Sequence, residues 1–171
     1  MRFALVLALA TAASADAGAT LERLDSVADA QAALRPRERA LVVHFWALWC
    51  APCLEELPVQ AELARQAKAA GADVLFINLD PPEQSARVLE QLKRAKALDA
   101  ARHVQLSQSV DPEAVTRLLD PRWNAGLPAT FALLPGGAIA ARALGPISQA
   151  DRANLLGKLR APTIVQPAAR P

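Results

Sequence analysis

The 171 residues of the chain, with a mass of 18.1 kDa, allow one domain with a hydrophobic core and are too few for two large domains. Hydrophobic residues make up 53% and charged residues 21%, which excludes a disordered protein. The 19 basic and 17 acidic residues leave a formal net charge of +2, so the chain lacks the large basic excess of an electrostatic nucleic-acid binder.

Residues 1–15 are typical of a cleaved secretory signal peptide. Arg2 precedes an apolar run over residues 3–13, and Ala13-Ser14-Ala15 supplies the small residues of a cleavage site. The apolar run is about 11 residues long, shorter than the roughly 20 that span a bilayer. We therefore expect export to the periplasm, an oxidising compartment where disulfides persist. An uncleaved signal that anchors the chain in the membrane stays open as an alternative.

The rest of the chain alternates apolar strands with helices. The expected elements are a helix over residues 21–34, a buried strand over 41–47, a helix from the cysteines to Gly71, a buried strand over 73–79 and a helix from Pro81. They are followed by a short helix from Asp111, a hairpin of residues 129–134 and 138–144, and a helix from Ser148 to about residue 159. This order predicts one α/β domain with a mixed sheet over residues 20–160, followed by a disordered tail over residues 161–171.

The two cysteines form a Cys50-Ala51-Pro52-Cys53 motif where a predicted strand passes into a predicted helix. Both sulfurs then lie on one helical turn, close enough to bond. The Cys50 sulfur faces unpaired backbone N–H groups and the positive end of the helix dipole, which stabilise a thiolate. Because the thiolate is the nucleophile of disulfide exchange, we expect Cys50 to attack and Cys53 to resolve. Pro52 stiffens this turn and removes one N–H donor.

A cysteine pair can also serve as a structural disulfide or as a metal ligand set. A structural disulfide closing so small a loop would constrain the unfolded chain little. Zinc needs four ligands, and the chain has only two cysteines and two histidines. Copper(I) accepts fewer ligands and prefers thiolates, so a copper(I)-binding chaperone stays open. We expect no metal, and no cofactor besides the disulfide of Cys50 and Cys53.

Residues 42–58 read VVHFWALWCAPCLEELP and resemble the active-site block of the thioredoxin superfamily, with the TlpA/ResA-like thiol-disulfide oxidoreductases as the most similar group. Farther along, residues 126–131 (GLPATF) resemble the cis-proline loop of the same superfamily. The resemblance implies a thioredoxin fold, in which helices flank both faces of a central mixed sheet. It also implies a thiol-disulfide oxidoreductase. The resemblance favours a reductase, and a dithiol oxidant stays open as an alternative.

The resemblance assigns roles to matching positions around the cysteines. Pro128 is expected in the cis form beside the disulfide, and Leu127 before it is expected to offer backbone groups to an extended substrate. Trp49 is expected to flank the reactive sulfur. Trp46 and Trp123 are interpreted as core residues.

Two positions depart from the family pattern or leave its role open. His44 stands where thioredoxins carry Asp and TlpA/ResA-like proteins often carry Asn, so it either exchanges a proton with Cys53 or is a core histidine. Glu56 matches a glutamate near the cysteines of ResA-like reductases, and it is either a proton acceptor or part of a solvated helix face. We expect Glu55 and His103 to lie on the surface.

The expected partners follow from the proposed chemistry. They are exported proteins that contain a disulfide or a dithiol, together with a membrane electron donor that keeps the reductase reduced. We expect no nucleic acid partner and a monomeric protein. A thiol peroxidase would place its cysteine in a P-x-x-x-T/S-x-x-C context, which the sequence lacks.

Overall fold

The computed structural model describes residues 21–36 and 38–159. The predicted signal peptide at residues 1–15 and the predicted tail at residues 161–171 lie outside this range, so both stay predictions. Within the described range, no helix is long and apolar enough to cross a membrane.

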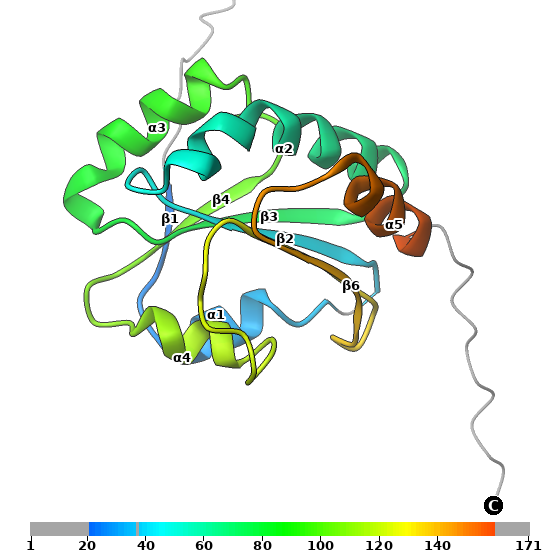
Figure 1. Ribbon diagram of the computed structural model, residues 1–171. Coiled ribbons are helices and arrows are strands. Elements are labelled where there is room, and N and C mark those ends of the chain that lie inside the picture. The colour runs from blue at the N-terminus through cyan, green and yellow to red at the C-terminus, as the bar shows by residue number, and fades with distance from the viewer. Residues whose placement is uncertain (1–20, 37, 160–171) are drawn as a thin grey trace, which may run out of the picture.

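A six-stranded mixed sheet forms the centre of the molecule, in the order β1-β4-β3-β2-β5-β6 (Figure 1). Its strands are β1 (Glu22–Leu24), β2 (Leu41–Trp46), β3 (Asp73–Asn78), β4 (Arg102–Leu106), β5 (Ala129–Leu133) and β6 (Ile139–Leu144). Strands β1, β4, β3 and β2 are parallel, whereas β5 runs antiparallel to β2 and β6 antiparallel to β5. All six residues of β2 are buried, as expected for a central strand covered on both faces.

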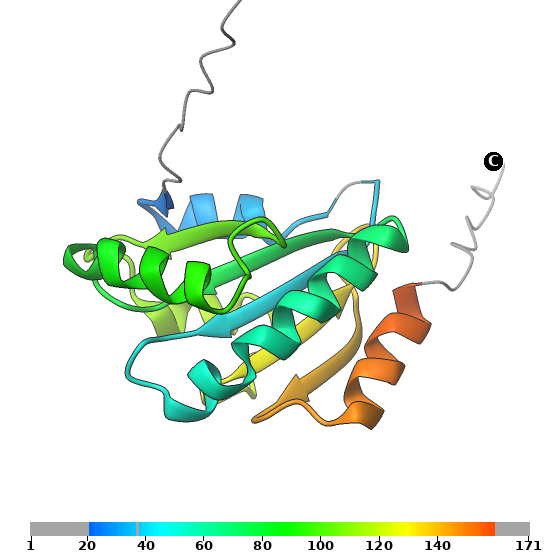
Figure 2. The same cartoon turned by 90° about the horizontal axis from the view of Figure 1, so that it is seen from above.

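Helices cover both faces of this sheet, as predicted (Figures 1 and 2). One face carries α2 (Ala51–Ala69), α3 (Ser85–Arg94) and α5 (Gln149–Leu159), and the other carries α1 (Val27–Ala33) and α4 (Pro112–Arg117). A short 3-10 turn, η1 (Pro82–Gln84), leads into α3. Successive residues of β2 point to opposite faces, so Trp46 packs in the layer under α2 and α3, whereas Phe45 packs with Trp123 on the other side. Both Trp46 and Trp123 are buried, which confirms their interpretation as core residues.

Helix α2 begins and ends where the sequence predicts. Cys50 is its N-cap, and Pro52 lies in the first turn, where a missing N–H costs no helical hydrogen bond. The helix ends at Ala69, and Gly71 follows its C-cap Ala70 with a φ of 87°, in the left-handed region that favours glycine. There the N–H groups of Gly71 and Ala72 donate to the carbonyls of Lys68 and Ala67, respectively, which closes the last turn.

The predicted caps of two other helices are confirmed. The Asp111 side chain accepts the N–H of Glu113 at 3.0 Å and caps α4. Ser148 and Asp151 form a reciprocal pair before α5: the Ser148 hydroxyl accepts the Asp151 N–H, and the Asp151 carboxylate accepts the Ser148 N–H.

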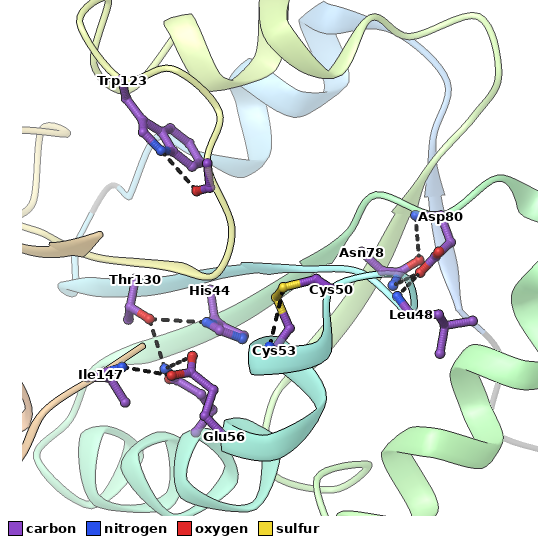
Figure 3. The surroundings of a disulfide bond; sticks show 12 residues. His44, Leu48, Cys50, Cys53, Glu56, Asn78, Asp80, Trp123, Thr130 and Ile147 are labelled. Atoms are coloured by element: carbon purple, nitrogen blue, oxygen red, sulfur yellow. Dashed lines mark hydrogen bonds between the residues drawn. A yellow bond between two sulfur atoms is a disulfide. The ribbon is translucent and has the colours of Figure 1, made fainter. Parts of the chain in front are cut away.

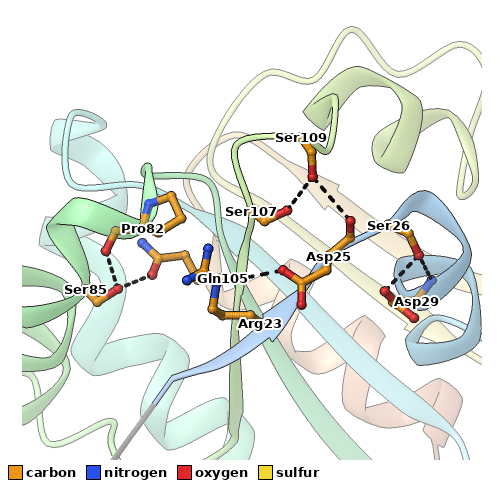
Figure 4. A network of polar contacts seen from close by, with 9 residues as sticks. All are labelled: Arg23, Asp25, Ser26, Asp29, Pro82, Ser85, Gln105, Ser107 and Ser109. Carbon is orange, nitrogen blue, oxygen red and sulfur yellow. Dashed lines mark hydrogen bonds and ion pairs between the residues drawn. The ribbon is translucent and has the colours of Figure 1, made fainter.

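Two strands were not predicted. Residues 21–34 form β1 followed by α1 and not one helix, because the Ser26 side chain caps α1 by accepting the N–H of Asp29 (Figure 4). Strand β1 has only three residues, and its parallel pairing with β4 is a tertiary contact that the local helical spacing does not reveal. Strand β4 was missed because it mixes polar and apolar side chains.

His103 lies in β4 and is half-buried, not the surface residue that the sequence predicts. Its Nε2 is 3.0 Å from the Ala97 carbonyl, and its ring meets that of Phe76 edge-on at a centroid distance of 5.3 Å. Burial lowers the pKa of His103.

Candidate active site

The cysteines lie on a tight turn between the central strand β2 and helix α2. The Cys50 N–H donates to the Ala47 carbonyl at 3.2 Å, which closes a turn over residues 47–50. Cys50 then becomes the N-cap of α2, and Cys53 is three residues into the helix. The buried strand therefore fixes where the helix starts, and the turn places both cysteines at the carboxyl end of the central strand β2.

Cys50 and Cys53 form a disulfide with an S–S distance of 2.07 Å. The Cys50 sulfur accepts the backbone N–H of Cys53 at 3.3 Å, so the sulfur faces a first-turn N–H donor as the sequence predicts (Figure 3). Cys53 is fully buried, whereas Cys50 keeps a relative exposure of 6%. The disulfide is therefore nearly buried, and what exposure remains lies on Cys50 and not on Cys53.

The loop at residues 126–131 brings the predicted proline to the cysteine layer. The Leu127-Pro128 peptide bond is cis, which confirms the prediction. Leu127 packs against the apolar cluster that contains both cysteines, and Pro128 is buried. The Gly145 N–H donates to the Pro128 carbonyl at 2.8 Å, and this bond ties the loop to the end of β6.

Tryptophan side chains differ sharply in exposure around this loop. Trp49, directly before Cys50, is 67% exposed, so a large aromatic surface lies open beside the disulfide. Trp123 is buried, packs edge-on against Phe45, and donates its indole N–H to the Gly126 carbonyl at 3.2 Å. Trp123 thus anchors the cis-proline loop to the core through Gly126, while the exposed Trp49 is available to a partner.

His44 is fully buried in β2, and Figure 3 shows its ring on the side of Cys53. Its Nδ1 is 3.1 Å from the Thr130 hydroxyl, whereas its Nε2 has no hydrogen-bond partner. Burial lowers the pKa of His44 to about 3, against a smaller opposing effect of a backbone hydrogen bond to Ala129. The imidazole is therefore neutral at pH 7.

Glu56 is buried in α2, so its interpretation as part of a solvated helix face is wrong. One carboxylate oxygen accepts the Gln60 amide at 2.9 Å, and the other accepts the Ile147 N–H at 2.7 Å (Figure 3). Burial raises the pKa of Glu56, and these two hydrogen bonds oppose the rise. Glu55, by contrast, is exposed as predicted.

A chain of hydrogen bonds links Glu56 to His44. Gln60 donates both to Glu56 and to the Thr130 hydroxyl, the latter at 3.0 Å, and Thr130 contacts His44. Sequence reasoning missed Gln60 and Thr130. The signal for Gln60 was its position on the inward face of α2, where a polar side chain needs a buried partner.

A third missed residue is Asp80, which follows β3 and is buried. Its carboxylate accepts the backbone N–H of Leu48, in the turn that carries the cysteines, at 2.7 Å. In the sequence, Asp80 stands directly before Pro81 and Pro82, a pattern that indicates only a loop and no functional residue.

Metal ligands are sparse in the part of the chain that the structure describes. There, no group of three or more His, Cys, Asp and Glu side chains could hold a metal ion. The expectations of no metal and no cofactor stay predictions.

The sheet, the flanking helices, the cis-proline loop and the cysteine pair at a helix start together define a thioredoxin-fold protein with a C-x-x-C disulfide. A family model described as the AhpC/TSA family matches residues 20–142. The chain therefore belongs to this family, within the thioredoxin superfamily that the motifs indicate.

Individual relatives agree with this assignment. The chain is 29% identical over 87 residues to the thiol-disulfide oxidoreductase ResA of Geobacillus kaustophilus, covering 49% of this chain and 50% of that protein. It is 27% identical over 85 residues to ResA of Bacillus cereus, covering 48% and 49%. The match thus spans about half the length of these curated relatives.

Solved structures share the fold. A thiol:disulfide interchange protein of the thioredoxin family from Chlorobium tepidum superposes with a TM-score of 0.55 at 22% identity, covering 76% of this chain and 84% of that chain. A thiol:disulfide interchange protein from Bacteroides sp. gives 0.52 at 20% identity, covering 78% and 77%. These likenesses confirm the predicted thioredoxin fold.

Proposed function

We propose that the protein is an exported thiol-disulfide oxidoreductase that acts as a reductase through Cys50 and Cys53. The observation that carries this proposal is the Cys50–Cys53 disulfide at the start of α2, next to a cis-proline loop. The Cys50 sulfur accepts a first-turn N–H, and Cys50 keeps slight exposure while Cys53 is fully buried. The membership of the AhpC/TSA family and the likeness to proteins named thiol-disulfide oxidoreductases support it.

The reaction begins with the reduced pair. The Cys50 thiolate attacks one sulfur of a substrate disulfide, the substrate S–S bond breaks, and one substrate thiolate leaves and takes a proton. Cys53 then loses its proton and attacks the Cys50 sulfur of the mixed disulfide. The Cys50–Cys53 bond forms, the second substrate sulfur leaves as a thiol, and two electrons have passed to the substrate. A dithiol donor at the membrane returns two electrons to the pair.

His44 is the proposed acceptor for the Cys53 proton. We assign the imidazole proton to Nδ1, which faces the Thr130 hydroxyl, so that Nε2 presents a free lone pair. A buried imidazolium is unfavourable alone, but the Cys53 thiolate formed on the same side of the sheet supplies the opposite charge. Glu56 is the weaker candidate because both of its carboxylate oxygens already accept hydrogen bonds.

The substrate contacts are assigned to the exposed groups around Cys50. Trp49 offers an exposed aromatic surface, and we assign the backbone of Leu127 to pair with an extended segment of a disulfide-containing exported protein. Pro52 keeps the turn between the cysteines stiff. We propose that the protein works as a monomer in the periplasm, after cleavage of residues 1–15.

A redox titration against glutathione tests the direction of the reaction. A reductase should have a Cys50–Cys53 potential near or below about −250 mV, whereas a value near about −120 mV would identify a dithiol oxidant. Alkylation of the reduced protein near neutral pH should label Cys50 well before Cys53. Equal labelling rates would overturn the assignment of attacking and resolving thiols.

Stopped-flow reduction of a protein disulfide tests the role of His44. We expect His44→Asn and His44→Leu to slow resolution of the mixed disulfide by about 10-fold or more, at the low end of general-base effects. Attack by Cys50 should keep its rate, because His44 lies on the side of Cys53. Unchanged resolution in both variants would leave His44 as a core residue only.

A further inference from the structure

The turn that carries Cys50 is held by a buried carboxylate from a different strand. Asp80 lies just after β3 and accepts the Leu48 N–H at 2.7 Å (Figure 3). The Cys50 N–H closes the same turn onto the Ala47 carbonyl. Leu48 is the second residue of this four-residue turn, so its N–H is not used by the turn itself. One bond from Asp80 therefore fixes the turn two residues before Cys50.

The Asp80 carboxylate is itself rigidly held. Asn78 donates its amide to the same Asp80 oxygen at 2.8 Å and accepts the Asp80 N–H at 3.1 Å. Behind them, the Gln105 amide of β4 donates to the carbonyls of Asp80 and Pro81, and the Ser85 hydroxyl donates to Gln105 at 2.6 Å (Figure 4). Asn78, Asp80 and Gln105 are all buried, where hydrogen bonds are strong and misplaced polar groups are costly. The anchor thus extends from the turn through β3 and β4 to α3.

Only one oxygen of this carboxylate is used. Oδ2 accepts both hydrogen bonds, whereas the buried Oδ1 has no partner. An asparagine could therefore place its carbonyl oxygen at the Oδ2 position and keep both bonds. Asp80→Asn removes the negative charge but preserves the two hydrogen bonds. The variant therefore separates the effect of the charge from the effect of the hydrogen bonds.

We propose that Asp80 is a positioning residue that holds the redox turn through Leu48, and that it matters most in the reduced protein. In the oxidised protein the disulfide also fixes Cys50 to α2. Reduction breaks that covalent link, and the bond from Asp80 to Leu48 then keeps the Cys50 sulfur on the Cys53 N–H. The inference rests on the proposed function, because it assumes that the pair cycles between the two states.

The test compares Asp80→Ala and Asp80→Asn with the parent protein in two measurements. The first is the alkylation rate of Cys50 by iodoacetamide at pH 7 in the reduced protein. The second is the reduction potential in glutathione buffers. We expect Asp80→Ala to slow alkylation by about 10-fold, the size of one hydrogen bond to a charged sulfur. A 10-fold loss of reduced-state stability also makes the potential about 30 mV more negative. Asp80→Asn should stay within about 2-fold of the parent.

Controls separate positioning from general stability. Ser85→Ala removes a bond within the same cluster but none to the turn, so it should change neither measurement. Leu48→Pro removes the donor from the other end and should reproduce Asp80→Ala, because proline suits the second position of a turn. It also serves if Asp80→Ala does not fold.

The outcomes are distinct. The inference is overturned if Asp80→Ala destabilises the oxidised and reduced proteins equally and leaves both measurements unchanged. It is also overturned if Asp80→Asn behaves like Asp80→Ala, since the charge and not the anchor would then be responsible. A parent protein that does not equilibrate with glutathione at all would overturn the proposed function itself.

Discussion

Replacing His44 with Leu should remove about 2 kcal/mol of the stability that the oxidised protein loses between pH 7 and pH 5. His44 has an ordinary pKa near 6.5 when unfolded, and burial lowers it to about 3 in the folded protein. Between these values the unfolded chain binds a proton that the folded chain does not, so stability is full above about pH 6.5 and falls as pH decreases. From pH 7 to pH 5 the loss is about 2 kcal/mol. This figure depends on the unfolded pKa alone, provided that the folded value stays well below 5.

Urea unfolding of the parent and of His44→Leu at pH 7 and pH 5 measures the effect. The parent should lose about 2 kcal/mol more than the variant over this interval, a midpoint difference of roughly 1 M urea. Other titrating groups, including Glu56, cancel in the comparison. His103→Leu is the matched control, and its smaller burial should give a smaller difference. Equal losses in the parent and in His44→Leu would show that the folded imidazole is well solvated, and would refute the reasoning.

Three further predictions concern stability near the site. Glu56→Ala should cost about 2 kcal/mol in urea unfolding at pH 7, because the Ile147 N–H and the Gln60 amide lose their acceptor, and a cost near zero would contradict that role. Leu57→Ala should cost about 2–5 kcal/mol in thermal or urea unfolding, because Leu57 is fully buried on the inner face of α2; a loss below 1 kcal/mol would mean that the core repacks. Trp123→Phe should cost about 1 kcal/mol through loss of the indole bond and speed amide hydrogen exchange in residues 124–127, and unchanged exchange there would refute the anchoring.

Much of the fold could be predicted because local chemistry and tertiary structure agree in those segments. The apolar run of β2, the C-x-x-C at the start of α2 and the glycine at its end each specify their own element. The caps at Asp111 and Ser148 likewise act within one turn of chain. Strands β1 and β4 differ, because their parallel pairing is decided by contacts distant in the sequence.

Motifs predicted the cysteine pair and the cis-proline, but no motif predicted the buried polar groups that support them. Asp80 follows β3, Gln60 lies in α2 and Thr130 lies in β5, and all three are buried. Asp80 accepts the Leu48 N–H, whereas Gln60 donates to Thr130, so each meets a partner from a distant part of the chain. A single sequence shows a polar residue at each place but not which partner it meets. The same reason explains Glu56, whose burial depends on the backbone of Ile147.

Strand β6 has a strand neighbour on one side only among the described residues, and this has a consequence for solubility. An unpaired strand edge is a template for aggregation, and Leu144 is 49% exposed on β6. Arg142 lies two residues earlier on the same face and pairs with Asp120, and a register shift between Ala132 and Leu133 interrupts the regular ladder. A charge and an irregular ladder both discourage addition of another strand. We therefore expect Arg142, which takes no part in the redox chemistry, to help keep the molecules from joining edge to edge.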